Sequence, residues 1–381
     1  MFKDELMLDH LPEGLIALVL HNSRVFSEKQ LRALLLASDS PSAIFQLSSD
    51  KLSSLGLDLL GHQQLSELLE QLFHLKTRQP LNYQLWEHCL EQQIGVVAIN
   101  QEGYPELLKT IYDPPPVLYY RGNLDLLHQP QLAIVGSRRC SKQGLNNARL
   151  FSRELTAAGF AICSGMALGI DSEAHRACLE QKGATIAVLG TGVDKIYPRQ
   201  NAELYKAIAQ RGLLLSELPP TAPARKAHFP RRNRMISGLS LGVIVVEADI
   251  KSGSLITARL ALEQNREVFA LPGSIHNQSS RGCHEIIRQG AKLTETTEHI
   301  LEELKGWLPQ TIIEKPVAES KVSELDPSLA QLLKQLSFHP QSIDSIHQQL
   351  NYPINQLMSD LLALELLGLV ENIAGAYQRL Q

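Results

Sequence analysis

The residues best suited to chemistry are densest between Phe229 and Gly238, in the run Phe-Pro-Arg-Arg-Asn-Arg-Met-Ile-Ser-Gly. This run places an aromatic ring, one asparagine and three arginines within six residues, namely Phe229, Arg231, Arg232, Asn233 and Arg234. Arginine forks bind phosphate oxygens bidentately, and an aromatic face stacks on a base with about 1–3 kcal/mol. The run therefore predicts a surface for single-stranded nucleic acid. The alternative is a structural arginine network paired with Glu217, Glu247 or Asp249.

Glycine- and serine-rich turns follow the predicted strands. In an open parallel sheet, ligands bind beyond the carboxyl ends of the strands, where backbone N–H groups and helix N-termini favour anions. The residues concerned are Gly136, Ser137, Arg138, Ser164, Gly165, Gly190, Gly192, Ser252, Gly253 and Ser254, together with Pro272-Gly273-Ser274. Arg138 would add a charge-assisted contact to a phosphate. We expect Asp171 and Asp194 to cap helices or tie these loops in place.

Catalytic and metal-binding signatures are missing from the sequence. It contains no HExxH, GxSxG or Walker A motif and no metal-ligand cluster. Lys226 and His228 precede Phe229, and the histidine is expected to be structural or to contact phosphate rather than act as a general base. The five cysteines are scattered without a CxxC pair and are expected to be buried free thiols. We expect a protein without catalysis, metal or cofactor.

Charge is distributed unevenly along the chain of 381 residues, whose net charge is −4. Residues 131–295 contain 22 Lys+Arg and 13 Asp+Glu, a balance of +9, so the remainder carries −13. A basic middle between acidic ends indicates one domain that meets a polyanion. No apolar run reaches the roughly 20 residues that span a bilayer, and the acidic start does not resemble a signal peptide. We expect a cytoplasmic protein with no membrane contact.

The middle of the chain alternates between apolar strands and helices. Strands are expected at 132–135, 160–163, 185–189, 213–215, 243–246 and 268–271, with helices from about Lys142, from about Ile170, and through Leu255 to Gln264. Continuous apolar strands alternating with helices predict a parallel sheet covered on both faces. The expected fold class is α/β, with a Rossmann-like, doubly wound core over residues 81–308. The segment 112–122 is interpreted as a proline-stiffened lead into this core.

Smaller modules are expected at both ends. Residues 1–80 show leucines at helical spacing and predict a helical module of the SAM or helix-hairpin kind. Residues 309–327 contain three prolines and predict a linker. Residues 328–381 predict three helices and a β-hairpin over 370–379, an order that suits a winged helix.

Taken in order, these motifs resemble the DprA/Smf family of DNA-processing proteins. The resemblance rests on Gly136-Ser-Arg138, Ser164-Gly-x-Ala-x-Gly-Ile-Asp171, Gly190-x-Gly-x-Asp-x-x-Tyr-Pro198, Phe229-Pro-x-Arg-Asn-Arg-x-Ile-Ser-Gly-Leu-Ser240 and Ser252-Gly-Ser-Leu-Ile-Thr-Ala258. With Tyr104-Pro105, Asp113-Pro-Pro115, Val246-Glu-Ala248, Pro272-Gly273 and Gly290-Ala291, it covers about half the chain. Asn265-Arg266 departs from the family's usual Gly-Arg at a helix end.

The resemblance implies a core that binds and protects single-stranded DNA during natural transformation, loads a RecA-type recombinase onto it and forms a homodimer. It implies that Arg138 holds a phosphate, Lys226 lines a basic pocket and Phe229 stacks on a base. Arg231, Arg232 and Arg234 would support the pocket or touch the DNA backbone. Apolar positions that could contribute to the dimer surface are Leu241, Leu255, Ile286 and Ile287.

Two other functions stay open. A nucleotide-processing enzyme of the phosphoribohydrolase type would carry Pro-Gly-Gly-x-Gly-Thr, from which Pro272-Gly273-Ser274 departs. An interaction scaffold could use the basic edge to bind an acidic protein. The winged-helix module contains 4 Lys+Arg and 8 Asp+Glu from Thr311 onward, and its predicted recognition helix, 354–367, has no basic residue. Since groove-reading helices need positive charge, we expect this module to bind protein.

Overall fold

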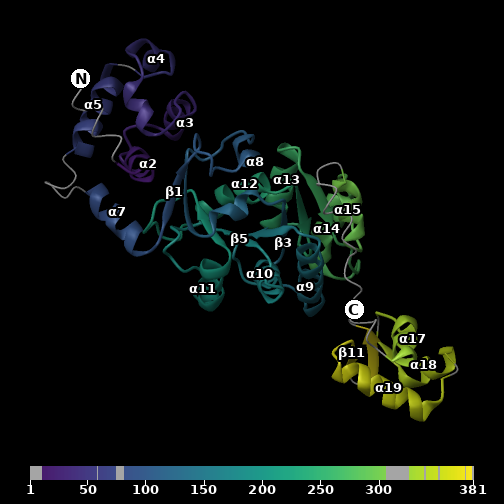
Figure 1. The fold of residues 1–381 in the computed structure, drawn as a ribbon. Helices are drawn as coiled ribbons and strands as arrows, with labels where there is room; N and C mark the ends of the chain where they lie inside the picture. Colours follow the sequence, from purple (N-terminus) through teal and green to yellow (C-terminus); the bar gives the residue numbers. More distant parts are fainter. Residues whose placement is uncertain are drawn as a thin grey trace. The chain divides into compact units, whose positions relative to one another are not determined.

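The computed structural model describes residues 11–57, 59–73, 81–305, 326–338, 340–350, 352–373 and 375–379. The chain forms two compact units, residues 1–314 and residues 315–381 (Figure 1). Almost all of the predicted linker, 309–327, lies outside the described residues. The division of the first unit into a module of residues 1–80 and a core of residues 81–308 stays a prediction.

Short helices with buried leucines precede the sheet. They are α2 (Glu13–Asn22), α3 (Glu28–Leu36), the 3-10 helix η1 (Ser42–Gln46), α4 (Ser49–Ser54), α5 (Leu59–Phe73) and α7 (Leu81–Glu91). Helix α3 begins with a capping box between Ser27 and Gln30, which satisfies backbone N–H groups that the helix leaves free. Leu18, Leu31 and Leu34 are fully buried. The expected helical character of this segment is confirmed where the structure describes it.

The core is built on a sheet with the order β1-β2-β6-β5-β4-β3-β7-β8-β9. Its strands are β1 (Gly95–Ala98), β2 (Val117–Gly122), β3 (Gln131–Val135), β4 (Ala161–Ser164), β5 (Thr185–Val188), β6 (Leu213–Ser216), β7 (Gly242–Val245), β8 (Glu267–Ala270) and β9 (Lys292–Leu293). Strands β3 to β8 confirm the six predicted strands and are parallel to their neighbours within this group.

The interpretation of residues 112–122 as only a proline-stiffened lead was wrong. Residues 117–122 form β2, which pairs antiparallel with both β1 and β6. Pro114, Pro115 and Pro116 lie just before this strand, so they leave its hydrogen-bonding groups intact. The sheet is therefore extended by an antiparallel pair that the β-α alternation did not reveal.

Helices cover both faces of the sheet (Figure 1). Leu132 and Ile134 of β3 pack with Phe151 of α9 (Lys142–Ala157) and Ile170 of α10 (Ile170–Glu180). The alternate residues of β3 belong to the other core, which includes α12 (His228–Leu239) and α13 (Ser254–Glu263). This alternation is the two-residue period of a strand buried on both faces. The remaining helices are α8 (Glu106–Lys109), η2 (Leu124–His128), η3 (Arg199–Asn201), α11 (Ala202–Arg211), η4 (Gln278–Ser280), α14 (Arg281–Arg288) and α15 (Glu298–Leu304).

The direction of the chain across the sheet reverses at β3. From β3 the chain builds outward through β4, β5 and β6, then returns to place β7 on the other side of β3. Loops leaving β3 and β7 diverge at such a point and open a crevice beyond the carboxyl ends of the strands. The fold class is thus a doubly wound α/β core, and the topology identifies the crevice at which such folds bind ligands.

The second unit contains α17 (Pro327–Gln335), α18 (Ile343–Leu350) and α19 (Ile354–Leu366) with the strands β10 (Gln341–Ser342), β11 (Val370–Ile373) and β12 (Ala376–Arg379). The strands form a sheet in the order β10-β12-β11. Leu357, Leu361 and Leu364 of α19 are fully buried in its own core. The predicted three helices and terminal hairpin are confirmed.

Candidate nucleic-acid interface

A cavity of about 700 Å³ opens at the β3–β7 crevice, and we call it the carboxyl-edge cavity. The turns after β3 and β7 and the first turns of α12 and α13 form its walls. Its lining includes Gly136, Ser137, Arg138, Arg139, Ala167, Asp171, Phe229, Pro230, Arg232, Asn233, Ile236, Asp249, Lys251, Ser252, Gly253, Ser254, Ile256, Thr257 and Gln278. Residues more than 100 positions apart in sequence are thus brought together.

A smaller cavity of about 90 Å³ adjoins it above β4 and β5. Gly165 and Gly190, which follow these two strands, line it. Arg138, Ala167, Phe229 and Arg232 line both cavities. The two hollows are therefore neighbours along the carboxyl edge, with the exposed Arg138 and the half-buried Phe229 at their junction.

Helix α12 decides which residues of the 229–238 run face the cavity. The run is helical from its start, and Pro230 lies in the first turn, where a missing N–H costs nothing. Phe229, Asn233 and Ile236 recur at helical spacing and line the carboxyl-edge cavity. Arg231 and Arg234 lie three residues apart on another face. The helix therefore separates residues that the sequence places side by side.

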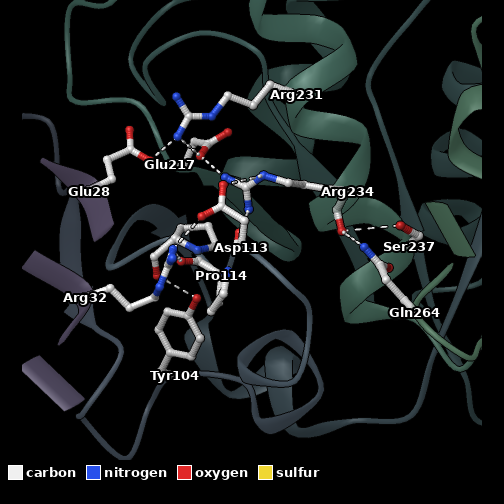
Figure 2. Close-up of polar contacts among 11 residues, drawn as sticks. Glu28, Arg32, Tyr104, Asp113, Pro114, Glu217, Arg231, Arg234, Ser237 and Gln264 are labelled. Atoms are coloured by element: carbon white, nitrogen blue, oxygen red, sulfur yellow. Dashed lines mark hydrogen bonds and ion pairs between the residues drawn. The ribbon is translucent and has the colours of Figure 1, made fainter. Parts of the chain in front are cut away.

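Arg231 and Arg234 of α12 belong to a network of charged residues that Figure 2 shows. Arg231 pairs with Glu217 at 3.2 Å and with Glu28 of α3, and Arg234 also pairs with Glu217. Arg234 donates to the backbone carbonyl of Asp113 at 2.5 Å. These two arginines therefore belong to a structural ion-pair network, which was the alternative to a DNA-binding role. Of the three partners suggested for that network, Glu217 is the one that they contact.

Figure 2 also shows that this network reaches the N-terminal helices. Arg32 of α3 pairs with Asp113 at 2.5 Å and donates to the carbonyl of Pro114 at 3.1 Å. Burial raises the pKa of the Glu217 carboxyl, while the guanidinium groups of Arg234 and Arg231 oppose that shift. The network fixes α12 against α3 and the 113–114 turn.

Arg232 is a buried support beneath both cavities. Only 5% of the residue is exposed, and its Nη1 donates to the carbonyl oxygen of Gly165 at 2.6 Å and to that of Val188. These carbonyls lie at the ends of β4 and β5, so one side chain joins the two turns. Burial lowers the pKa of the guanidinium to about 10, which the carboxylate of Asp171 opposes.

Asp171 ties the β4 turn together, as expected. Its Oδ2 accepts hydrogen bonds from the backbone N–H groups of Gly165 at 3.2 Å and Ala167 at 3.4 Å. Burial raises the pKa of this carboxyl, and the nearby Arg232 guanidinium opposes the shift. Asp194 also ties loops, because its Oδ1 accepts from the backbone N–H of Thr221 at 2.8 Å.

Glu247 shapes the turn that carries Arg138. Its backbone oxygen accepts from the N–H of Ser137 at 2.7 Å, and its Oε2 accepts from the N–H of Ser141 at 2.8 Å. A Cβ at Gly136 would lie 2.6 Å from the side chain of Ile170, so only glycine fits there. Glu247, which follows β7, and Ile170 of α10 therefore hold the turn after β3 in place. Arg138, in the same turn, is exposed.

Phe229 pairs with Tyr197, which was not among the predicted site residues. Their ring centroids are 5.3 Å apart with planes tilted by 36°. A Cβ at Gly190 would lie 2.9 Å from the Phe229 ring, so the glycine allows the ring to pack against the β5 turn. Tyr197 is 46% exposed. The pair offers a partly exposed aromatic surface suited to stacking on a base.

Several predicted residues lie elsewhere. Ser164 is fully buried and donates to the carbonyl of Ile134 at 2.6 Å. Gly192 packs against Pro219 and Asp194. Lys226 is exposed two residues before α12, but it is outside the described lining of the two cavities. Leu255 and Ile286, suggested for a dimer surface, are buried in the core.

Two cations of the site were not singled out from the sequence. Arg139 and Lys251 are exposed and line the carboxyl-edge cavity, beside Arg138 and before Ser252 respectively. Their signal was their position in the turns that follow strands β3 and β7. Because charged residues are common in surface turns, their residue type alone could not distinguish these two cations from other exposed charges.

Comparison with known proteins identifies the family to which this chain is related. The profile described as DNA recombination-mediator protein A matches residues 95–305, and the DprA winged helix domain matches residues 316–376. Protein Smf of Escherichia coli strain K12 is 42% identical over 290 residues, covering 75% of this chain and 77% of that protein. DNA processing protein DprA of Streptococcus pneumoniae is 48% identical over 214 residues, 56% of this chain and 76% of that protein.

Solved structures show the same relationship. DNA processing protein A of Streptococcus pneumoniae has a TM-score of 0.63 at 38% identity, covering 75% of this chain and 95% of that chain. DNA processing protein A of Helicobacter pylori, described for its single-stranded DNA binding mode, has a TM-score of 0.51 at 33% identity, covering 56% and 96%. With more than half of its length matched by the family profile, this chain belongs to the DNA recombination-mediator protein A family, which comprises the DprA and Smf proteins.

Proposed function

We propose that this protein binds single-stranded DNA along the carboxyl edge of its sheet, without catalysis. One observation carries the proposal: the exposed Arg138 and the Phe229–Tyr197 pair meet where the two edge cavities join. A cation beside a partly exposed aromatic pair matches the two demands of a single strand, which are phosphate neutralisation and base stacking. The basic balance of residues 131–295 supports the same conclusion.

The charges around the carboxyl-edge cavity favour an anion. Arg138, Arg139 and Lys251 are exposed cations in its lining. Of the acidic lining residues, Asp171 is occupied by two backbone N–H groups, and Asp249 accepts from the backbone N–H of Lys251 at 3.1 Å. The exposed side chains therefore present mostly positive charge, and the strand would be held without base-specific contacts.

Absence of catalysis is part of the proposal. Asp171 holds a turn together, and His228 lies outside the described lining of both edge cavities. A general base must reach the proton that it abstracts; His228 is not placed to do so in the edge cavities, and Asp171, which lines the larger one, has its Oδ2 engaged by the two backbone N–H groups. Release of free base from nucleoside monophosphates would instead indicate the phosphoribohydrolase alternative.

The wider role that we propose is protection of DNA during natural transformation and loading of a RecA-type recombinase, by a homodimer formed through the core. Family membership supports these steps, as does the single-stranded DNA binding described for the Helicobacter pylori relative. The winged-helix unit would serve protein interaction, since α19 has an apolar exposed ridge and no basic residue. A pull-down of the recombinase by the full-length protein, with and without single-stranded DNA, tests the loading step.

Binding itself is tested with labelled oligothymidylate at two or more salt concentrations. Arg138→Ala should weaken binding and reduce the slope of log affinity against log salt by about 0.7 for each phosphate that is no longer neutralised. Phe229→Ala should cost about 1–3 kcal/mol, roughly 5- to 150-fold in affinity. Arg211→Ala is the control, because Arg211 is an exposed arginine that ends α11 on the amino side of β6. Wild-type affinity in both cavity variants would refute the site.

A further inference from the structure

A second large cavity, of about 610 Å³, lies beyond β6 next to the N-terminal helices, and we call it the N-terminal cavity. It is formed by the end of α2, by α7 and by the proline-rich loop that follows β6. Its lining is Asn22, Arg24, Gln84, Leu85, His88, Leu218, Pro219, Pro220, Thr221, Ala222, Pro223, Arg225 and His228. Its volume falls in the range of about 300–1,000 Å³ that is usual for ligand sites.

The charge of this cavity is one-sided. Arg24 and Arg225 are exposed in its wall, and no aspartate or glutamate belongs to its described lining. Neither arginine forms an ion pair with a carboxylate in the part of the chain that the structure describes. Arg231 and Arg234, by contrast, are neutralised by Glu217. Because these two cations have no counter-charge among the described residues, the N-terminal cavity favours an anionic ligand.

The backbone of the wall is strained where it faces this cavity. Arg24 has φ 57° and Thr221 has φ 70°, left-handed values that cost non-glycine residues on the order of 1–3 kcal/mol each. Thr221 is kept there by its N–H bond to Asp194, whose Oδ2 also lies 3.1 Å from His88 Nε2. Residues in such conformations are concentrated at functional and ligand sites.

The position of the cavity relates it to the site already described. The carboxyl-edge cavity lies at the ends of β7 and β3, the smaller cavity at the ends of β4 and β5, and the N-terminal cavity at the loop after β6. The three cavities therefore follow one another in the same order as these strands are arranged in the sheet. At about 4.8 Å per strand, β7 to β6 spans about 19 Å. Arg225 and His228 line the N-terminal cavity, and the residue after His228, Phe229, lines both the carboxyl-edge cavity and the smaller cavity. The exposed Lys226 lies in the turn just before His228 and Phe229 at the start of α12.

We infer that the N-terminal cavity holds the continuation of the same single strand, with Arg24 and Arg225 each neutralising a phosphate and the proline-rich loop supporting the sugars and bases. The inference rests on the proposed function and extends it, because it makes the N-terminal helices part of the DNA site. Lys226 would contact the strand as it crosses the start of α12. This explains how an exposed lysine outside both edge cavities could still serve binding.

The length of the oligonucleotide separates this inference from the proposed function. Wild type and the double variant Arg24→Ala/Arg225→Ala are titrated with a short oligothymidylate of about 5 nucleotides and a long one of about 16, within the usual range of site sizes. The double variant should bind the long strand about 10-fold more weakly, with a salt slope reduced by about 1.4 because two phosphates are no longer neutralised. The short strand should be bound as by wild type, because it fits in the edge cavities.

Other outcomes overturn the inference in distinguishable ways. Unchanged affinity and slope for the long strand would remove the cavity from the path, and an equal loss for both lengths would mean that the arginines act on the edge cavities. Poly-glutamate is titrated in parallel as an acidic polypeptide; if the double variant keeps its affinity for both oligonucleotides but loses binding of poly-glutamate, the inference fails and the cavity serves an acidic protein. If wild type binds neither oligonucleotide, the proposed function fails first. Arg211→Ala again serves as the matched control and should match wild type at both lengths.

Discussion

At the scale of single residues, neighbours in sequence perform different tasks. Arg232 is buried and joins the β4 and β5 turns, whereas Arg231 and Arg234 pair with Glu217. Arg138, from a turn almost 100 residues earlier, is the exposed arginine at the junction of the two edge cavities. The number of arginines in a motif therefore says little about how many contact a ligand. What decides the matter is whether a carboxylate or a carbonyl has already engaged the guanidinium group.

His175 leads to a prediction about pH. It is fully buried in α10, its Nδ1 lies 2.7 Å from Thr185 Oγ1, and burial lowers the pKa of its ring to about 3. The unfolded chain takes up this proton near pH 6.5 and the folded one does not, so stability is lost as pH falls from 6.5 toward 3. At pH 5 the loss attributable to His175 should be on the order of 2 kcal/mol.

The measurement is thermal or urea unfolding at pH 7 and pH 5. His175→Asn keeps a polar atom near the position of Nδ1 but cannot be protonated. The variant should be less stable than wild type at pH 7 yet show a smaller loss between the two pH values. His276→Asn, at an exposed histidine of the loop that follows β8, is the control and should keep the wild-type difference. An identical pH dependence in His175→Asn and wild type would contradict the assignment.

At the scale of elements, one face of α12 lines the edge cavities, and another carries the arginines that pair with Glu217. Arg234→Ala would leave Glu217, of which only 7% is exposed, with Arg231 as its remaining partner, so the loss of stability should lie below the about 3–5 kcal/mol of a buried charge left fully unpaired. The affinity of the folded variant for single-stranded DNA should stay within about 2-fold of wild type, because Arg234 does not line either edge cavity. Arg138→Ala should show the opposite pattern, with weak binding and unchanged stability.

Chemical unfolding and DNA titration of the same samples measure both effects. Arg234→Ala/Glu217→Ala should recover part of the lost stability, since it also removes the buried carboxylate that has lost one of its two arginine partners. If the single variant Arg234→Ala loses DNA affinity as strongly as Arg138→Ala while remaining folded, the two faces of α12 are not independent. That result would assign Arg234 to the binding surface after all.

The elements were also where prediction from sequence reached its limit. Strands β3 to β8 were predictable because each is a short apolar run between turn residues. Strand β2 was not, since prolines precede it and its pairing with β6 is antiparallel and distant in sequence. Helix α12 was not predicted because its arginines and Pro230 conceal the helical period. Tyr197 reaches the site only through the folded β5 loop, so no local pattern could connect it with Phe229.

At the scale of the whole molecule, the two units differ in the chemistry of their surfaces. The first presents exposed cations along the carboxyl edge of its sheet. The second presents Ile354, Met358, Leu362 and Leu366 along α19, with 42%, 55%, 55% and 81% of each residue exposed. An exposed apolar ridge on a helix is suited to a protein partner. Because the helix has no lysine or arginine, it has no side chain that could neutralise a phosphate. None of the described helices has the length and apolar character needed to cross a membrane.

This difference predicts which part of the chain holds DNA. Removing residues 315–381 should leave the affinity for single-stranded DNA within about 2-fold of the full chain, with the same salt slope, because the proposed phosphate ligands all belong to the first unit. Leu362→Asp in the full chain is the companion variant: its exposed side chain should tolerate the charge, so folding and DNA affinity should both persist. Titration of the three proteins with one oligothymidylate decides the matter. A fall in salt slope on truncation would mean that the acidic unit binds phosphates, and the protein-binding role assigned to α19 would then have to be abandoned.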